Sequence, residues 1–281
     1  MQDLDELPFL VKLLDDEDEI VRRRLAEKFH QFPGDVSRQL QSLNIDLAPA
    51  ERRHLSELLS PGRLRRIRNE WFVPRQSLDS GECDWETFEF LLRLLSDLLH
   101  DGTTVRPDFF DTLDQVAEDA RLHGAGAGSR ALCDHLFGSG KFGANSDGYY
   151  DTNNSDLLWV MLNRKGNPIG LAVLAMLVGH RLGHQIWGCN FPGHFLAWID
   201  SGVDAALVDC YHRGRVIPIT ELRKNPGQLS DDARRAIKHP CTLRDILLRI
   251  LTNLQFAFVQ NQDHDHIELV GELLQTLADD S

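Results

Sequence analysis

Residues Ile169–Leu182 form a run with almost no polar side chain, and this run constrains the fold more than any other part of the chain. A helix that is apolar all round is buried on every side, and 14 residues are too few to cross a bilayer. Asn167 is suited to the N-cap of this helix, Pro168 to its first position and Gly183 to its C-terminal end. We therefore expect a buried central helix on which the other elements pack.

Three short apolar segments follow the helix and predict a small antiparallel sheet. They are rich in aromatic and β-branched residues, and a Pro-Gly turn separates the first two. The segments are Ile186–Phe191, Phe195–Ile199 and Ala205–Cys210. A buried helix followed by strands that carry His194 and then Asp209 has the order of a cysteine–histidine–aspartate hydrolase core. The sequence thus predicts an α+β fold.

The first turn of the expected helix lacks a nucleophile. A catalytic thiol at a helix N-terminus is activated by free N–H groups and the helix dipole, while a histidine takes its proton and an acid orients the imidazole. Residues 167–172 read Asn-Pro-Ile-Gly-Leu-Ala, and none of these side chains can attack a carbonyl carbon. His194 and Asp209 therefore supply a base and its orienting acid without a nucleophile.

Two longer stretches carry a family resemblance. The stretch that begins at Gly166 reads GNPIGLAVLAMLVGHRLGHQIWGCNFPGHFLAW, and the preceding Tyr149–Pro168 reads YYDTNNSDLLWVMLNRKGNP. Together with Asp209 and the glycine-containing hairpin after it, they resemble the core of the transglutaminase-like superfamily, and more closely its SirB-type branch. The resemblance covers Leu132–Leu222 and implies a papain-like core, in which a buried helix lies on a small antiparallel sheet.

The resemblance also implies a degenerate catalytic site. It places the superfamily's catalytic cysteine at or beside Pro168, and it retains His194 and Asp209 as a dyad. Gly170 stands where the branch usually has a hydroxyl residue, and Cys210 stands where it often has proline. We therefore expect a protein without catalytic activity that acts by binding a protein or peptide.

An enzymatic alternative stays open. The dyad of His194 and Asp209 would then serve a hydrolase or acyltransferase whose nucleophile is Cys189, Cys210 or a water molecule. Strand alternation and the tight Pro-Gly turn count against Cys189, and free cysteines are usually buried packing residues.

We expect the cleft to lie between the start of the buried helix and the strand that bears His194. Strand alternation cannot place every aromatic side chain of the two strands inside it. The candidate binding residues are Asn167, Pro168, Trp187, Cys189 and Phe195.

No metal site or cofactor is expected. His180 and His184 are four residues apart, as on one face of a helix, but Gly183 is expected to end the helix between them and no third ligand is near in sequence.

Helical segments flank the predicted core. Leu7–Phe32 predicts an amphipathic pair with an acidic turn, which resembles a single HEAT-type repeat. Thr242–Gln260 and a helix after it resemble the tetratricopeptide-like tail of SirB-type proteins. Other helices are predicted at Pro49–Leu59, Arg63–Phe72, Trp85–His100 and Pro107–His123. We expect four regions: a HEAT-like segment at 1–60, a helical region at 61–128, the transglutaminase-like core at 129–240 and a tetratricopeptide-like pair at 241–281.

Composition narrows the class of partner. The 281 residues include 43 acidic and 30 basic side chains, and the formal charge of −13 disfavours nucleic acid as a partner. The 5 cysteines are scattered and show no Cys-x-x-Cys spacing. No signal peptide and no run of about 18 apolar residues is present, so we expect a cytoplasmic protein that does not bind membranes.

Overall fold

The computed structural model describes residues 4–74, 78, 84–200, 205–224, 227 and 229–279. The chain divides into two compact units. The smaller unit contains the residues up to Phe72 and Leu94–Pro107, and the larger contains Val73–Arg93 and the residues from Asp108 onward. The division into four regions at residues 60, 128 and 240 stays a prediction.

The smaller unit is built from helices around an apolar core. The carboxylate of Asp18 accepts hydrogen bonds from the N–H groups of Ile20 and Val21 and so caps the second helix. Buried leucine, valine and phenylalanine side chains from the first four α-helices of the chain and the loops between them form one cluster. The helices are α1 (Leu7–Val11), α2 (Glu19–Phe29), α3 (Ser37–Ser42) and α4 (Pro49–Glu70).

One prediction for this unit was wrong. We expected separate helices at Pro49–Leu59 and Arg63–Phe72, but α4 is continuous and contains Pro61. The buried side chains Leu55, Leu59, Leu64 and Ile67 keep a helical spacing on both sides of the proline. Tertiary packing along this face outweighs the lost backbone hydrogen bond at the proline.

The larger unit is organised around helix α9 (Pro168–Arg181), whose residues from Pro168 to Gly179 are all buried. Gly183 follows it with φ of 74°, the left-handed conformation that ends helices. The helices before α9 are α6 (Phe109–Leu122), α7 (Ser129–Cys133) and α8 (Leu157–Asn163). Helix α5 (Trp85–Leu99) has its N-terminal part in this unit. Single-turn helices are η1 (Leu4–Glu6, in the smaller unit), η2 (Ala125–Ala127), η3 (Asp134–Gly138) and η4 (Thr152–Ser155).

A four-stranded antiparallel sheet with the order β3-β4-β5-β6 packs against α9. On one face, Ile186 approaches Gly179 of α9. On the other, Cys189, Leu196 and Leu207 pack with Ile219 and Ile237. The strands are β3 (Ile186–Cys189), β4 (Leu196–Asp200), β5 (Ala205–Asp209) and β6 (Arg215–Pro218), and a separate parallel pair joins β1 (Gly143–Ala144) to β2 (Lys165–Gly166).

The turn between β3 and β4 is longer than predicted. The predicted strands extend to Phe191 and begin again at Phe195, whereas β3 ends at Cys189 and β4 begins only at Leu196. Gly193 has φ of 75°, and the N–H of His194 donates to the carbonyl of Phe191 over 3.0 Å. This hydrogen-bonded turn prevents the local chain from joining the sheet.

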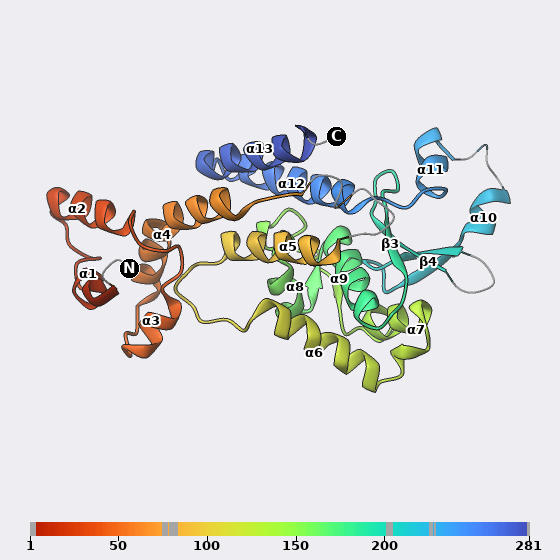
Figure 1. Cartoon of the computed structure of the whole chain (residues 1–281), viewed down its shortest axis with the longest axis horizontal. Helices are drawn as coiled ribbons and strands as arrows, with labels where there is room; N and C mark the ends of the chain where they lie inside the picture. Colours follow the sequence, from red (N-terminus) through yellow and green to blue (C-terminus); the bar gives the residue numbers. More distant parts are fainter. Residues whose placement is uncertain are drawn as a thin grey trace. The chain divides into compact units, whose positions relative to one another are not determined.

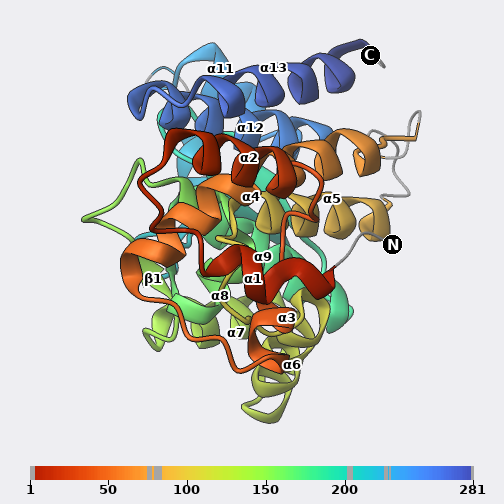
Figure 2. The same cartoon turned by 90° about the vertical axis from the view of Figure 1, so that its left-hand side faces the viewer.

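Helices α10 (Ile219–Lys224), α11 (Asp231–Ala236), α12 (Leu243–Gln260) and α13 (His264–Asp279) complete the chain. Thr242 and Asp245 form a capping box at the start of α12. Helices α12 and α13 lie side by side as a hairpin in both views (Figure 1 and Figure 2). The predicted α+β class is confirmed. Among the described residues, no helix is long and apolar enough to span a bilayer.

Candidate functional site

The start of α9 has the cap that the sequence predicts and no nucleophile. Oδ1 of Asn167 accepts a hydrogen bond from the N–H of Gly170 over 2.8 Å, and Pro168 occupies the first turn. A Cβ added at Gly170 would lie 3.0 Å from the carbonyl oxygen of Asn154. Gly170 therefore allows the segment before α8 to pack closely on the first turn of α9.

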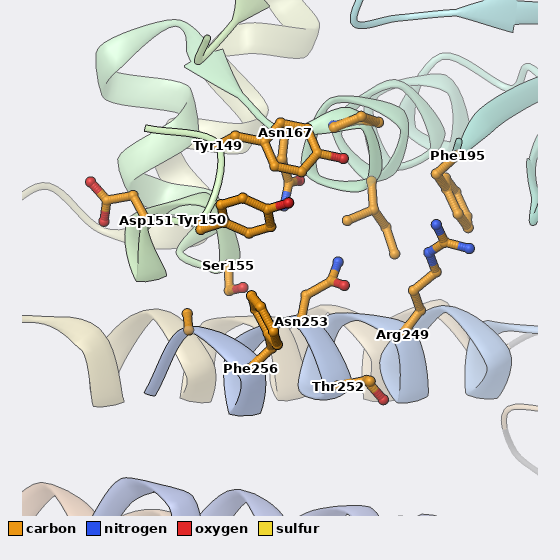
Figure 3. A pocket seen from close by; sticks show the side chains of 13 residues that line it. Tyr149, Tyr150, Asp151, Ser155, Asn167, Phe195, Arg249, Thr252, Asn253 and Phe256 are labelled. Atoms are coloured by element: carbon orange, nitrogen blue, oxygen red, sulfur yellow. The ribbon is translucent and has the colours of Figure 1, made fainter. Parts of the chain in front are cut away.

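A cavity of about 310 Å³ opens at this helix start. Its walls come from four parts of the larger unit: the segment around η4, the first turn of α9, the turn before β4 and the polar face of α12. Figure 3 shows Arg249, Asn253 and Phe256 projecting from α12 toward this space. The lining residues are Tyr149, Tyr150, Asp151, Ser155, Asn167, Pro168, Ile169, Phe195, Arg249, Thr252, Asn253, Phe256 and Ala257.

Exposed aromatic rings form the rim of the cavity. Tyr150 is 66% exposed, Phe256 48% and Tyr149 42%. The ring of Tyr150 lies 5.1 Å from that of Tyr149 and 5.4 Å from that of Phe256, measured between centroids. Three neighbouring aromatic side chains that remain accessible are characteristic of a binding surface rather than of a packed core.

Arg249 gives the cavity a positive charge. Its guanidinium lies over the ring of Phe195, 5.7 Å from the centroid, and donates a hydrogen bond to Oδ1 of Asn190. Within the described part of the chain, no carboxylate forms an ion pair with Arg249. A half-buried guanidinium that contacts a neutral amide and an aromatic ring can bind the carboxylate group of a ligand.

The structure brings His194 and Asp209 together. Nε2 of His194 donates to Oδ1 of Asp209 over 2.8 Å, and Nδ1 of His212 donates to Oδ2 over 2.8 Å. Burial alone would raise the pKa of Asp209, but the hydrogen bonds from the two histidines hold this pKa below its ordinary value. Asp209 is therefore a carboxylate held between two imidazoles.

The dyad does not line the cavity at α9. We expected a cleft between the helix start and the strand that bears His194, but the wall facing the helix start is α12, and Phe195 is the lining residue from that strand region. The ring of His194 packs against Tyr211 at 6.3 Å, and Tyr211 packs against Tyr149 at 6.0 Å. Two tyrosine rings thus link the dyad to the cavity rim.

Neither candidate thiol is accessible. Cys189 and Cys210 are both 0% exposed. The Sγ–H of Cys189 donates to the carbonyl of Ala236 over 3.4 Å, on the sheet face that packs against Ile219 and Ile237. Burial raises the pKa of Cys189 to about 12 and that of Cys210 well above its ordinary value. Neither side chain has the properties of an activated nucleophile.

The other candidate residues named from the sequence do not all lie at the cavity. Asn167, Pro168 and Phe195 line the cavity. Trp187 packs near Trp85, with ring centroids 6.1 Å apart, and is not a lining residue. His180 stacks on Trp85 at 4.7 Å, whereas Nε2 of His184 lies 3.0 Å from the carbonyl oxygen of Ala125, so these two imidazoles have different partners.

Sequence reasoning missed His212 and the residues contributed by α12. Asp209-x-x-His212 is a spacing that brings two side chains together in a turn. Arg249, Asn253 and Phe256 recur on the polar side of an amphipathic helix, where a phenylalanine is unexpected. An aromatic residue on that face was the available signal for a binding surface.

Comparison with known proteins identifies a family and several relatives to which this sequence is similar. Residues 108–252 match the family model described as the transglutaminase-like superfamily. Two UPF0162 proteins of Xylella fastidiosa, from strains 9a5c and Temecula1, are each 37% identical over 137 residues, which cover 47% of this chain and 49% of theirs. F-box only protein 21 of Homo sapiens is 27% identical over 127 residues, which cover 42% of this chain and 20% of its own. The chain thus spans about half the length of these UPF0162 relatives. No solved structure gives a significant match.

Proposed function

This chain belongs to the transglutaminase-like superfamily, and we propose that it is a non-catalytic member that binds a segment of a protein partner in the cavity at the start of α9. The SirB-type resemblance supports this proposal, because it places a proline where the superfamily has its catalytic cysteine.

One observation carries the proposal: within the described residues, no accessible thiol lies beside the dyad. Cys133, Cys189 and Cys210 are buried, and Cys241 is partly buried. Cys83 lies outside the described residues. A cysteine nucleophile acts as a thiolate, and burial raises the pKa of each described thiol above its ordinary value.

The cavity has the properties of a peptide site. Its volume of about 310 Å³ is at the lower end of the range typical of ligand pockets. The rim of Tyr149, Tyr150 and Phe256 can cover apolar side chains, and the amides of Asn167 and Asn253 can bond a peptide backbone. Arg249 favours a segment with a carboxylate next to its apolar residue.

The helical tail takes part in this binding function. Because α12 supplies Arg249, Asn253 and Phe256, a core that ends before residue 241 would lack one wall of the cavity. We therefore assign α12 of the predicted region 241–281 to the binding site and not to an independent array.

A peptide-display selection on the immobilised full chain tests the proposal. Peptides that bind the wild-type chain are then measured against Phe256→Ala and Arg249→Ala. Val259→Ala is the matched control, because Val259 is on the same helix with 49% exposure against 48% for Phe256, and it does not line the cavity. We expect affinity to fall about tenfold or more in both cavity variants and to stay unchanged in the control. Selected peptides that bind all three variants equally would contradict the proposal.

The enzymatic alternative rests on the 2.8 Å hydrogen bond between His194 and Asp209, which is the arrangement of a general base and its orienting acid. It is tested by measuring ester hydrolysis, amide hydrolysis and ammonia release from glutaminyl peptides. Turnover that falls about 10²-fold or more in His194→Ala but persists in Cys189→Ala and Cys210→Ala would favour catalysis with an activated water. Turnover that is lost in Cys189→Ala or Cys210→Ala would favour a thiol nucleophile.

A further inference from the structure

Among the described residues, two clusters of histidine and aspartate side chains have their possible ligand atoms within 4.8 Å of one another. The first consists of His194, Asp209 and His212, and the second of Asp119, His123 and His135. We propose that the first cluster binds one divalent metal ion of the zinc class and that the second does not. This site is separate from the peptide cavity, and its existence does not depend on the proposed function.

The atoms of the first cluster have the spacing of neighbouring ligands around one ion. Nε2 of His194 and Nδ1 of His212 each lie 2.8 Å from an oxygen of Asp209. Nitrogen and oxygen ligands lie about 2.0–2.2 Å from zinc, so that neighbouring ligands of a tetrahedral site are about 3.3–3.6 Å apart, slightly farther than these atoms are now. Small shifts of the three side chains suffice to place an ion between them.

The backbone holds two of these ligands in a defined arrangement. Asp209 ends β5 and His212 follows within the same turn, where the N–H of His212 donates to Oδ1 of Asp209 over 3.1 Å. The N–H of Gly214 donates to the carbonyl of Asp209 over 2.9 Å and closes this turn. Metal-binding carboxylates in proteins are typically oriented by a hydrogen bond from a neighbouring group, and the N–H of His212 provides such a bond to Asp209.

The third ligand comes from the turn before β4. The N–H of His194 is bonded to the carbonyl of Phe191, which fixes the backbone from which the imidazole projects. The side chains of His194 and Asp209 are 23% and 12% exposed, whereas that of His212 is 65% exposed. Two ligands are therefore sheltered, and the third leaves a path by which an ion can enter.

Charge distinguishes the two clusters. In the second cluster, Nζ of Lys141 bonds to Asp119 and lies 3.2 Å from Nε2 of His135, so an ammonium already neutralises the carboxylate. In the first cluster, no lysine or arginine among the described residues bonds to Asp209. The second cluster therefore already contains a cation, the ammonium of Lys141, whereas the described residues supply none to the first cluster. The two clusters otherwise consist of the same residue types.

The ligand chemistry defines the class of ion. Two imidazole nitrogens and one carboxylate suit zinc, and they also suit cobalt and nickel, which prefer similar donors. Three protein ligands leave a coordination position for water or for a group of another molecule. A concavity lined by Tyr211, His212 and Arg213 lies next to the cluster and can admit such a molecule.

Metal binding by the full chain tests this inference. After removal of bound metal with a chelator, Zn²⁺ is titrated by calorimetry, and Co²⁺ is titrated by its visible absorption as a report on ligand geometry. The variants are His212→Ala and His194→Ala, and His135→Ala in the second cluster is the matched control. We expect one equivalent of metal to bind to the wild-type chain and to His135→Ala, and affinity to fall at least about tenfold in the other two variants.

Because the side chain of His212 is mostly exposed, His212→Ala is expected to fold, and a thermal melt without metal verifies this. Wild-type binding that is no tighter than that of His212→Ala would overturn the proposal. Binding that is lost in His135→Ala and retained in His212→Ala would overturn it as well. Loss of peptide binding in the cavity variants would have no bearing on either result.

Discussion

Nε2 of His194 donates a hydrogen bond to Oδ1 of Asp209 over 2.8 Å, although His194 does not line the cavity at the start of α9. In a cysteine-dependent hydrolase the base must lie beside the thiol that it deprotonates. Here Pro168 lines the cavity, whereas the base His194 does not. The ring of His194 packs against Tyr211, which in turn packs against Tyr149 at the cavity rim. The dyad joins the turn before β4 to the end of β5, which is a structural role independent of catalysis.

The Asp209→Asn substitution should reduce stability at neutral pH and change its pH dependence. The pKa of Asp209 is lower in the folded chain than its ordinary value, so its carboxylate stabilises the fold above the unfolded pKa of about 4. That stabilisation is lost as the pH falls through the folded pKa. We expect Asp209→Asn to be less stable than wild type by about 1–3 kcal/mol at pH 7, with a difference that shrinks below about pH 4. Urea unfolding between pH 7 and pH 3 measures both effects.

Glu268→Gln is the control for this experiment, because Glu268 is an exposed carboxyl on α13. It should follow the wild-type curve at every pH. A constant difference between Asp209→Asn and wild type down to pH 3 would show that the hydrogen bonds at Asp209 do not favour its ionised form.

The described cysteines should react slowly with thiol reagents in the native state. Burial raises the pKa of Cys133 and Cys189 to about 12, and that of Cys241 to about 11. A thiol with a pKa of 12 is ionised in only about one molecule in 10⁴ at pH 8. In a Cys83→Ser variant, which retains these thiols and Cys210, we expect little reaction with a disulfide reagent until urea is added. A rapid native thiol whose rate falls in Cys83→Ser/His194→Ala would identify a nucleophile beside the dyad.

The central helix and the sheet were predictable because they depend on local patterns. The apolar run at Ile169–Leu182 and the caps Asn167 and Gly183 specify one buried helix whatever surrounds it. The continuity of α4 through Pro61 was not predictable, because it depends on a buried face that forms only in the packed unit. The proline favours a break in the helix at this point, but tertiary packing of the buried face outweighs that preference.

The cavity was only partly predictable. Asn167, Pro168 and Phe195 belong to the motif that specifies the core, and they do line the cavity. The opposite wall is α12, which is more than fifty residues away along the chain, so no local pattern connects Arg249 or Phe256 with the helix start. Such long-range pairing becomes visible only in three dimensions.

Arg181→Ala should destabilise the larger unit strongly. At the end of α9, the guanidinium of Arg181 binds both carboxylate oxygens of Glu89, at 2.5 and 2.9 Å, and also donates to Asp114 over 2.6 Å. The side chains of Arg181 and Glu89 are only 19% and 11% exposed. Removing one partner leaves a sheltered charge unpaired, which costs about 3–5 kcal/mol. Denaturant unfolding monitored by circular dichroism gives the loss.

The matched control is Arg130→Ala, which removes an exposed pair with Asp134 whose side chains are 54% and 52% exposed. An exposed pair contributes about 0–1 kcal/mol, so this variant should unfold close to the wild-type midpoint. Equal losses in the two arginine variants would show that the burial of the pair between Arg181 and Glu89 has no energetic consequence.

Gly34→Ala should destabilise the smaller unit, because the backbone at Gly34 touches α4. A Cβ at Gly34 would lie 2.5 Å from the backbone nitrogen and 2.7 Å from the Cα of Arg63. Arg63 cannot move away freely, since its guanidinium donates to the carbonyls of Gly34, Ser56 and Asp101. We expect a loss of about 1–3 kcal/mol or more, measured as a fall in the thermal midpoint.

Gly62→Ala tests the same contact from the opposite side. Its Cβ would lie 2.8 Å from the backbone nitrogen of Gly34 and 2.7 Å from the carbonyl oxygen of Phe32. Either methyl group forces the same two segments apart, so the losses in the double variant should be smaller than the sum of the single losses. Gly126→Ala is the control, because its Cβ would meet nothing within 4 Å. If Gly34→Ala has the same thermal midpoint as Gly126→Ala, the loop that contains Gly34 is free to move away from α4, and the close contact contributes nothing to the stability of the unit.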